Sequence, residues 1–140
     1  MAAKKILLPV DGSEHSRHAC AYGVGLAKKL GASVVLLHAY GSISMLLTGE
    51  GRREVLDELA AEALNGMEPY RALVREAGLE ATELVEEGRA ADVIIKAAAR
   101  EACDLVVMGS RGLSDAEGLI VGSVAHRVLE MAHCPVLIVR

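Results

Sequence analysis

Two segments combine residue types that could bind an anionic ligand. One is a glycine-rich motif, Gly109-Ser110-Arg111-Gly112, followed by nine residues and then Gly122-Ser123. Glycine lets backbone amides approach phosphate oxygens without a Cβ clash, and a helix that begins near Ser123 would add N–H donors and the positive end of its dipole. The other segment is Asp11-Gly12-Ser13, whose carboxylate can accept hydrogen bonds from hydroxyl or amino groups. Together they predict a site for a phosphate-bearing ligand.

Both segments follow short apolar runs that have the length of buried strands. Such runs cover residues 4–10, 33–39, 80–87, 104–109 and 136–139. Helical patterns separate them, and the pattern over residues 52–76 is expected to kink or break between Asn65 and Pro69, because proline removes an amide donor. The alternation predicts an α/β fold, a doubly wound five-stranded parallel sheet of order 3-2-1-4-5 with helices on both faces.

In this order the first and fourth strands are neighbours, so the two segments open into one crevice at their carboxyl ends. The third run carries Glu83, Glu86 and Glu87 and suits one edge of the sheet. The run Val136–Val139 would lie at the other edge, yet every position in it is apolar. We therefore expect a second copy of the chain to cover it, in a homodimer through Val136–Val139.

Length and composition favour one domain over residues 1–140 and exclude several kinds of partner. The chain is 52% apolar, has a net charge of −4 and contains neither Phe nor Trp. It therefore offers no basic field for nucleic acid or an anionic membrane surface, and few aromatic platforms for stacked bases. The first apolar run is too short for a signal peptide, and no apolar stretch has the length of a membrane span, so we expect a cytoplasmic location.

The cysteines and histidines do not predict a disulfide or a metal site. The cysteines are odd in number and widely spaced, which indicates reduced core thiols: Cys20, Cys103 and Cys134. Cys20 is the thiol whose pKa neighbouring charges could lower, because Arg17 and His18 precede it. His126 and His133 lie on similar faces of one helical segment but have no third ligand nearby in the sequence.

Several residues of the two segments also have a purely structural interpretation. Ser13 is expected to act chiefly as the N-cap of the first helix, and Ser123 could cap the last helix with or without a ligand. Arg111 is either a phosphate partner or a solvated surface charge. Apolar spacing in the last helix predicts an inner face formed by Val124, Val128, Leu129 and Met131.

The whole pattern resembles the universal stress protein family, in particular the subgroup whose Gly-x-x-Gly-x9-Gly-Ser/Thr motif binds ATP. The resemblance covers nearly the full length and is carried by residues 6–13, 37–39, 104–112, 122–124 and 134–139. It implies that adenine and ribose are held by Asp11 and by the backbone near Pro9, Val10 and Ala39. It implies that ribose and phosphates are held by Gly109, Arg111, Gly112, Gly122, Ser123 and Val124. By the same resemblance, Met108 would line the pocket.

The spacer inside the glycine motif carries acidic residues where many ATP-binding relatives carry basic ones. It contains Asp115 and Glu117 and has no Lys or Arg. A bound triphosphate would meet this negative charge unless the two side chains point outward or a divalent cation, Mg²⁺ or Mn²⁺, lies between them.

The leading functional expectation is an ATP-binding universal stress protein that acts as a nucleotide-dependent regulator in the stress response. One alternative is a slow ATPase or an enzyme that transfers adenylate or phosphate, although the sequence offers no nucleophile with an evident base. The other alternative is a nucleotide-free dimeric scaffold, which the acidic spacer favours.

Overall fold

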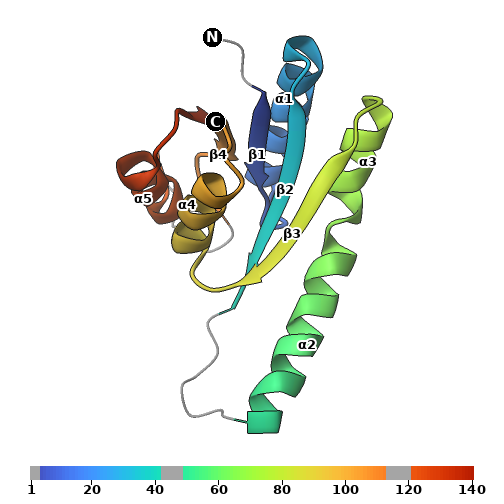
Figure 1. The fold of residues 1–140 in the computed structure, drawn as a ribbon, viewed down its shortest axis with the longest axis vertical. Coiled ribbons are helices and arrows are strands. Elements are labelled where there is room, and N and C mark those ends of the chain that lie inside the picture. Colours follow the sequence, from blue (N-terminus) through green and yellow to red (C-terminus); the bar gives the residue numbers. More distant parts are fainter. Residues whose placement is uncertain (1–3, 42–48, 113–120) are drawn as a thin grey trace.

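Five parallel strands form one sheet in the computed structural model, which describes residues 4–41, 49–112 and 121–140. The strands are β1 (Lys5–Pro9), β2 (Ser33–Tyr40), β3 (Ala81–Glu87), β4 (Leu105–Gly109) and β5 (Val136–Val139). Their order is β3-β2-β1-β4-β5, with every neighbouring pair parallel (Figure 1). The predicted doubly wound α/β sheet and its strand order are confirmed.

Helices cover both faces of the sheet. They are α1 (Glu14–Leu30), α2 (Gly49–Gly66), α3 (Glu68–Glu76), α4 (Ala90–Arg100) and α5 (Ser123–Met131). In Figure 1, α4 and α5 lie on one side of the sheet, and α1, α2 and α3 lie on the other. Each side has its own apolar core: Ile6 and Leu8 pack with α1 and α3, whereas Leu7 packs with α4 and α5. Successive side chains of β1 thus point to opposite faces, and burial on both faces explains why its sequence is continuously apolar.

The predicted break in the second helical segment is confirmed. α2 ends at Gly66 and α3 begins at Glu68, with the buried Met67 between them. Pro69 lies in the first turn of α3, where a backbone amide has no intrahelical acceptor to lose. Arg71 holds the two helices together, because its guanidinium donates to the carbonyl oxygen of Leu64 at the end of α2.

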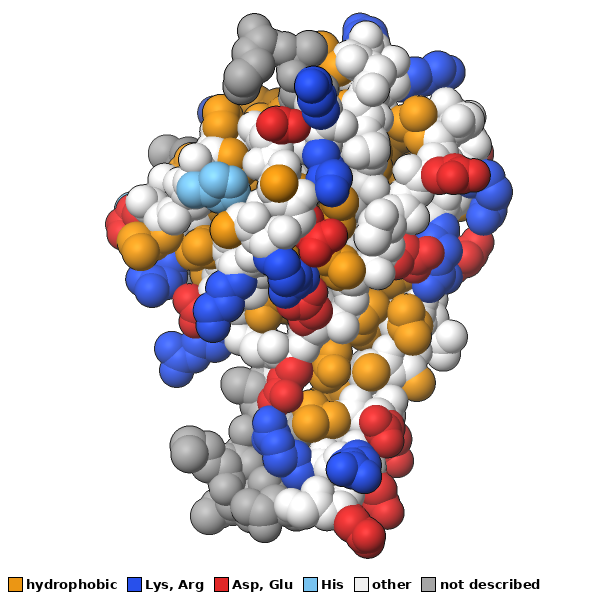
Figure 2. Space-filling model, in the orientation of Figure 1, with side chains coloured by type: hydrophobic (Ala, Val, Ile, Leu, Met, Phe, Trp, Pro, Cys, Tyr) orange, Lys and Arg blue, Asp and Glu red, His pale blue; other side chains and the backbone are white. Residues whose placement is uncertain are grey.

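The acidic strand β3 lies at an edge of the sheet, as predicted. Its carboxylates are paired with arginines from three helices: Glu83 with Arg71, Glu86 with Arg100 and Glu87 with Arg52. On the face that Figure 2 shows, positive and negative side chains are interspersed rather than gathered by sign. The described side chains on that face therefore form no broad basic surface, in line with the expectation drawn from net charge.

One prediction about side-chain environment was wrong and another was confirmed. In α5, Leu129 and Met131 are 45% and 54% exposed, and the fully buried positions are Ala125 and Val128. α5 packs beside α4 and the edge strand β5, so it buries only a narrow face and leaves the flanking positions outside. Cys20 is buried in the core, as predicted. Burial raises its pKa to about 12, so the preceding Arg17 and His18 do not lower it.

The other two cysteines also have raised pKa values. Burial raises the pKa of Cys103 to about 11, and it raises that of the half-buried Cys134 in the same direction. All three cysteines are free thiols, as the sequence indicated. Within the described ranges, no group of three or more His, Cys, Asp or Glu side chains is arranged to hold a metal ion, and none of the helices is long and apolar enough to cross a bilayer.

Candidate functional site

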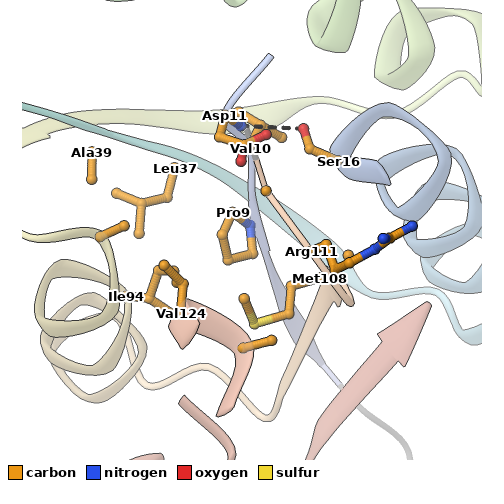
Figure 3. Close-up of a pocket in the computed structure, with 14 residues that line it drawn as sticks. Pro9, Val10, Asp11, Ser16, Leu37, Ala39, Ile94, Met108, Arg111 and Val124 are labelled. Atoms are coloured by element: carbon orange, nitrogen blue, oxygen red, sulfur yellow. Dashed lines mark hydrogen bonds between the residues drawn. The ribbon is translucent and has the colours of Figure 1, made fainter. Parts of the chain in front are cut away.

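A cavity of about 220 Å³ opens where β1 and β4 end side by side. Its walls come from the carboxyl ends of β1, β2 and β4, from the loops after β1 and β4, and from α1, α4 and α5 (Figure 3). This is the point at which the winding of the sheet reverses, where the loops after neighbouring strands diverge and leave room for a ligand. The structure therefore brings the two chemically distinctive segments of the sequence to one place.

All but two of the predicted site residues line this cavity. Those that do are Pro9, Val10, Asp11, Ala39, Met108, Gly109, Arg111, Gly112 and Val124. The exceptions are Gly122 and Ser123, which lie at the start of α5 but do not contribute to the lining. Asp115 and Glu117 fall outside the described residues.

Gly122 has a structural role that the sequence did not reveal. It is the N-cap of α5, so the predicted capping role of Ser123 was wrong. Its amide donates a hydrogen bond of 2.6 Å to the carbonyl oxygen of Ser110. The Gly122 N–H is thus satisfied within the protein, and the second and third residues of α5, Val124 and Ala125, are the ones that reach the cavity.

Five lining residues were not predicted: Ser16, Leu37, Ala90, Ile94 and Ala125. A signal for one of them was present, because Leu37 and Ala39 are two positions apart on β2 and must share a face. Ile94 packs in the core and also reaches the cavity at the edge of that core. The sequence of α4 alone does not show that Ile94 reaches the cavity, because that depends on how α4 packs over the strand ends.

One side of the cavity is apolar. Figure 3 shows Pro9, Leu37, Ile94, Met108 and Val124 grouped together. Leu37 and Met108 are almost fully buried, so their exposed atoms face the cavity rather than the outside of the molecule. Such a wall suits a flat apolar group, because apolar and aromatic surface gains most from leaving water.

The other side of the cavity is polar. It is formed by Asp11 and Ser16 after β1, and by Arg111 and Gly112 after β4. In Figure 3 the Arg111 side chain extends away from the apolar wall of Pro9 and Met108. Because the two sides differ in this way, the cavity can hold a ligand with an apolar ring at one end and polar or anionic groups at the other.

The turn after β1 is organised by its own side chains. The Asp11 carboxylate accepts hydrogen bonds from the Ser13 amide, at 2.9 Å, and from the Ser13 hydroxyl, at 2.6 Å. Ser13 is the N-cap of α1 and accepts from the Ser16 amide at 3.1 Å, so the predicted cap is confirmed. Gly12 has a φ of +86°, a conformation that L side chains rarely adopt. Asp11 is therefore held in a fixed orientation at the cavity wall.

A buried tyrosine from α3 supports the same turn. The Gly12 amide donates to the Tyr70 hydroxyl at 2.9 Å, and the hydroxyls of Tyr70 and Ser16 are 2.6 Å apart. The Asp11 amide in turn donates to Ser16 Oγ at 3.2 Å. Tyr70 is only 2% exposed, and burial raises its pKa, so the phenol keeps its proton at neutral pH.

The neighbouring strand β2 fixes the residue before this turn. The Val10 amide donates to the carbonyl oxygen of Leu37 at 2.8 Å, and His38 Nδ1 lies 2.8 Å from the carbonyl oxygen of Val10. Because a carbonyl oxygen only accepts, His38 Nδ1 carries the hydrogen. Val10 is thus hydrogen-bonded through both its amide and its carbonyl oxygen, which fixes this part of the wall.

Gly109 brings the two segments close to each other. A Cβ atom at this position would lie 3.0 Å from the backbone carbon and oxygen of His15, in the first turn of α1. The absence of a side chain therefore lets the end of β4 approach the start of α1 directly. This gives the first glycine of the motif a packing role in addition to any contact with a ligand.

Comparison with known proteins places these features in a family. The model of the universal stress protein family matches residues 2–140. A Thermus aquaticus protein named "Universal stress protein in QAH/OAS sulfhydrylase 3'region" is 37% identical over 139 residues, which cover 98% of this chain and 98% of the relative. The universal stress protein MJ0531 of Methanocaldococcus jannaschii is 34% identical over 139 residues, which cover 98% of this chain and 82% of the relative.

Solved structures show the same architecture. The structure of MJ0577 from Methanocaldococcus jannaschii has a TM-score of 0.90 and 29% identity, and the match covers 99% of this chain and 96% of that one. A universal stress protein in complex with cAMP has a TM-score of 0.76 and 24% identity, covering 100% and 99%. An Arabidopsis thaliana universal stress protein family protein with AMP bound has a TM-score of 0.69 and 20% identity, covering 97% and 90%. The last two likenesses establish the shared fold.

The sequence motifs, the strand order and these matches agree over nearly the whole length of the chain. We conclude that the chain belongs to the universal stress protein family.

Proposed function

We propose that the cavity at the ends of β1 and β4 binds an adenine nucleotide, ATP above all, and that the protein acts as a nucleotide-dependent regulator. One observation supports this proposal above the others. The cavity has an apolar wall on one side and a rigid polar turn on the other, and it lies beside the start of α5. A nucleotide has the matching parts, a flat base, a ribose with hydroxyl donors and a chain of anionic phosphates.

In this proposal the base packs against the apolar wall and the ribose lies near Asp11. The wall is formed by Pro9, Leu37, Ile94, Met108 and Val124. The Asp11 carboxylate, which lines the cavity, would accept hydrogen bonds from ribose hydroxyls. The phosphates would extend toward Arg111, Gly112 and the first turn of α5, where backbone amides and the helix dipole favour negative charge.

The nucleotides in the two relatives support the choice of an adenine base. One was solved in complex with cAMP, and the Arabidopsis thaliana protein was solved with AMP bound. A regulatory role is favoured over catalysis by the composition of the site, since Asp11 and Arg111 are the ionisable side chains among the described residues that line it. Asp11 is already engaged by Ser13, and general-base activation of a nucleophile would need a group that is poised for proton transfer.

The absorption spectrum of the freshly purified protein is the first test. The chain has no Trp and three Tyr, so its own absorbance near 280 nm is weak and copurified nucleotide would dominate at 260 nm. Calorimetric titration with ATP, AMP and GTP, each with and without Mg²⁺, then measures affinity and base preference. Heat from neither adenine nucleotide under either condition would contradict the proposal, and release of ADP over hours would show turnover.

A substitution at Ala39, which lines the cavity beside Leu37 of the apolar wall (Figure 3), tests where the base lies. Ala39→Met would fill part of the cavity with a flexible side chain and is expected to raise the dissociation constant of ATP more than tenfold. Ala99→Met is the matched control, because Ala99 is exposed on α4 and does not line the cavity. Equal ATP affinity in both variants and the wild type would place the base elsewhere.

We also propose a homodimer in which β5 pairs with its counterpart in a second copy. β5 lies at an edge of the sheet, and its Val136, Leu137 and Ile138 are only half-buried in one chain. An apolar edge strand without blunting charges favours such a self-complementary contact. Sedimentation velocity at micromolar concentration is expected to give the mass of two chains. A single-chain mass at that concentration would contradict the dimer.

A further inference from the structure

We infer that the Ser16 hydroxyl donates a hydrogen bond to the ligand in the cavity, and that Tyr70 sets the direction of that bond. The inference rests on the proposed nucleotide binding and adds to it a contact residue and a positioning residue. Ser16 lies in the first turn of α1 and lines the cavity. It is only 4% exposed, so its hydroxyl faces the cavity and the turn after β1 rather than bulk solvent.

The hydrogen bonds around Tyr70 determine which hydroxyl donates to which. The Gly12 amide can only donate, so the Tyr70 oxygen accepts at 2.9 Å. The nearest partner for the phenolic hydrogen is Ser16 Oγ, at 2.6 Å. In the reverse arrangement, the Tyr70 oxygen would accept twice and its hydrogen would have no acceptor among the hydrogen bonds of the described residues, which is costly for a side chain that is 2% exposed. Tyr70 therefore donates to Ser16.

Ser16 Oγ then accepts two hydrogen bonds. One comes from Tyr70, and the other comes from the Asp11 amide at 3.2 Å. A serine hydroxyl has two lone pairs and one hydrogen, so both lone pairs are used, and none of the hydrogen bonds among the described residues takes up the hydrogen. Because Ser16 lines the cavity, a ligand acceptor such as a ribose oxygen or a ring nitrogen is the partner that this hydrogen fits.

Tyr70 acts without touching the ligand. It does not line the cavity at the ends of β1 and β4, but instead lines a smaller one of about 140 Å³ on the other side of the turn, between that turn and the junction of α2 and α3. Its ring packs in the core between α1 and α3, which fixes the position of the hydroxyl. Burial raises the pKa of the phenol, so its proton stays available for donation throughout the neutral range. Tyr70 is accordingly a positioning residue.

Matched variants test both roles by calorimetry with ATP. Ser16→Ala removes the proposed donor, and Tyr70→Phe removes only the hydroxyl that orients it. Each is expected to raise the dissociation constant about five- to tenfold, as for the loss of one hydrogen bond. Ser33→Ala and Tyr22→Phe are the controls, because Ser33 begins β2 at the opposite end of the sheet and Tyr22 is 55% exposed on α1. Both controls are expected to bind like the wild type.

The double variant Ser16→Ala/Tyr70→Phe separates positioning from general loss of structure. If Tyr70 acts through Ser16, the double variant binds about as weakly as Ser16→Ala alone, instead of showing the product of the two effects. Amide exchange measured by NMR gives a second readout, since Tyr70→Phe removes the acceptor of the Gly12 amide and is expected to accelerate its exchange.

Three outcomes would overturn the inference, and they are distinguishable. If Ser16→Ala binds ATP with wild-type affinity, Ser16 does not contact the ligand. If Tyr70→Phe binds ATP with wild-type affinity, or if the loss of affinity in the double variant is the product of the two single losses, Tyr70 does not position Ser16. If the wild type itself binds no nucleotide, the proposed function fails together with the inference, whereas in the first two cases the proposed function stands.

Discussion

The amide of Gly122 donates a hydrogen bond of 2.6 Å to the carbonyl oxygen of Ser110, and this bond joins the start of α5 to the end of β4. The Ser110 amide in turn donates to the carbonyl oxygen of Val139, the last residue of β5. The two ends of the glycine motif are therefore held together by the chain itself. The same bonds connect the loop that lines the cavity to β5, the strand that we propose forms the dimer contact. A ligand in the cavity could therefore affect dimerisation through only two backbone hydrogen bonds.

The first prediction concerns the close contact between β4 and α1. Gly109→Ala would place a methyl group 3.0 Å from backbone atoms of His15, which cannot move without shifting the first turn of α1. We expect the free energy of unfolding to fall by about 1–3 kcal/mol, as for other overpacked sites. Urea denaturation measures this change. ATP affinity should fall as well, because α1 carries Ser16 into the cavity wall.

Gly25→Ala is the matched control for this substitution. Gly25 is exposed in the middle of α1, and a Cβ atom there would meet no other atom within 4 Å. Alanine loses less backbone entropy than glycine on forming a helix. We therefore expect the free energy of unfolding of Gly25→Ala to be about 0.5–1 kcal/mol higher than that of the wild type. Equal stability of the two variants would mean that the contact with His15 relaxes at no cost.

Most of the fold could be predicted from the sequence because its local signals agree. Continuous apolar runs such as the one around Leu7 indicated strands buried on both faces, and the charge of Glu83 and its neighbours indicated an edge. The environment of individual side chains was harder to predict. Whether Leu129 is buried depends on how much of the α5 surface the neighbouring elements cover. The width of that covered face is set by tertiary packing, so the apolar periodicity of the sequence does not predict it.

The second prediction separates the two interpretations of Arg111. If the guanidinium contacts phosphates, Arg111→Ala should weaken ATP binding at least tenfold and leave adenosine binding nearly unchanged, because charge-assisted hydrogen bonds would be lost only with the phosphorylated ligand. Arg53→Ala, at an exposed position of α2, controls for the change in net charge. Parallel calorimetric titrations with ATP and adenosine give both affinities. An equal effect on the two ligands, or none on either, would make Arg111 a surface charge.

The third prediction concerns the junction of α2 and α3. Arg71 donates to the Leu64 carbonyl oxygen and to Glu83, both at 2.6 Å, and thereby joins two helices to the edge strand β3. The pKa of Arg71 is raised, chiefly by its hydrogen bond to Glu83. Arg71→Ala is expected to lower the free energy of unfolding by about 1 kcal/mol. Arg75→Ala, which removes a far more exposed arginine of α3, should change it by less than about 0.5 kcal/mol, and a larger effect at Arg75 would be unexpected.

The candidate site was predictable to the extent that it depends on strand ends and glycines. Asp11 and Gly112 line the cavity because the strand order brings their loops together, and that order followed from the sequence. Tyr70 was not predictable in this way. It lies more than fifty residues from Ser16 along the chain, in a helix whose docking depends on the break at Met67, and a tyrosine on an apolar face looks like an ordinary core residue.

The last prediction concerns stability at alkaline pH. Burial raises the pKa of Cys20 to about 12 from an ordinary value of 9.0, so above pH 9 the unfolded chain loses this proton while the folded chain keeps it. Unfolding is then favoured progressively, and the contribution of Cys20 is fully present below pH 9 and is lost between about pH 9 and pH 12. The free energy of unfolding then falls with pH by at most about 1.4 kcal/mol per pH unit for one such thiol.

Urea denaturation at pH 7 to 11 checks this. The free energy of unfolding of Cys20→Ala should decline less steeply at alkaline pH than that of the wild type. Cys134→Ala, at a half-buried thiol, should change the decline less, and identical slopes in all three proteins would show that Cys20 ionises as readily in the folded chain as in the unfolded one.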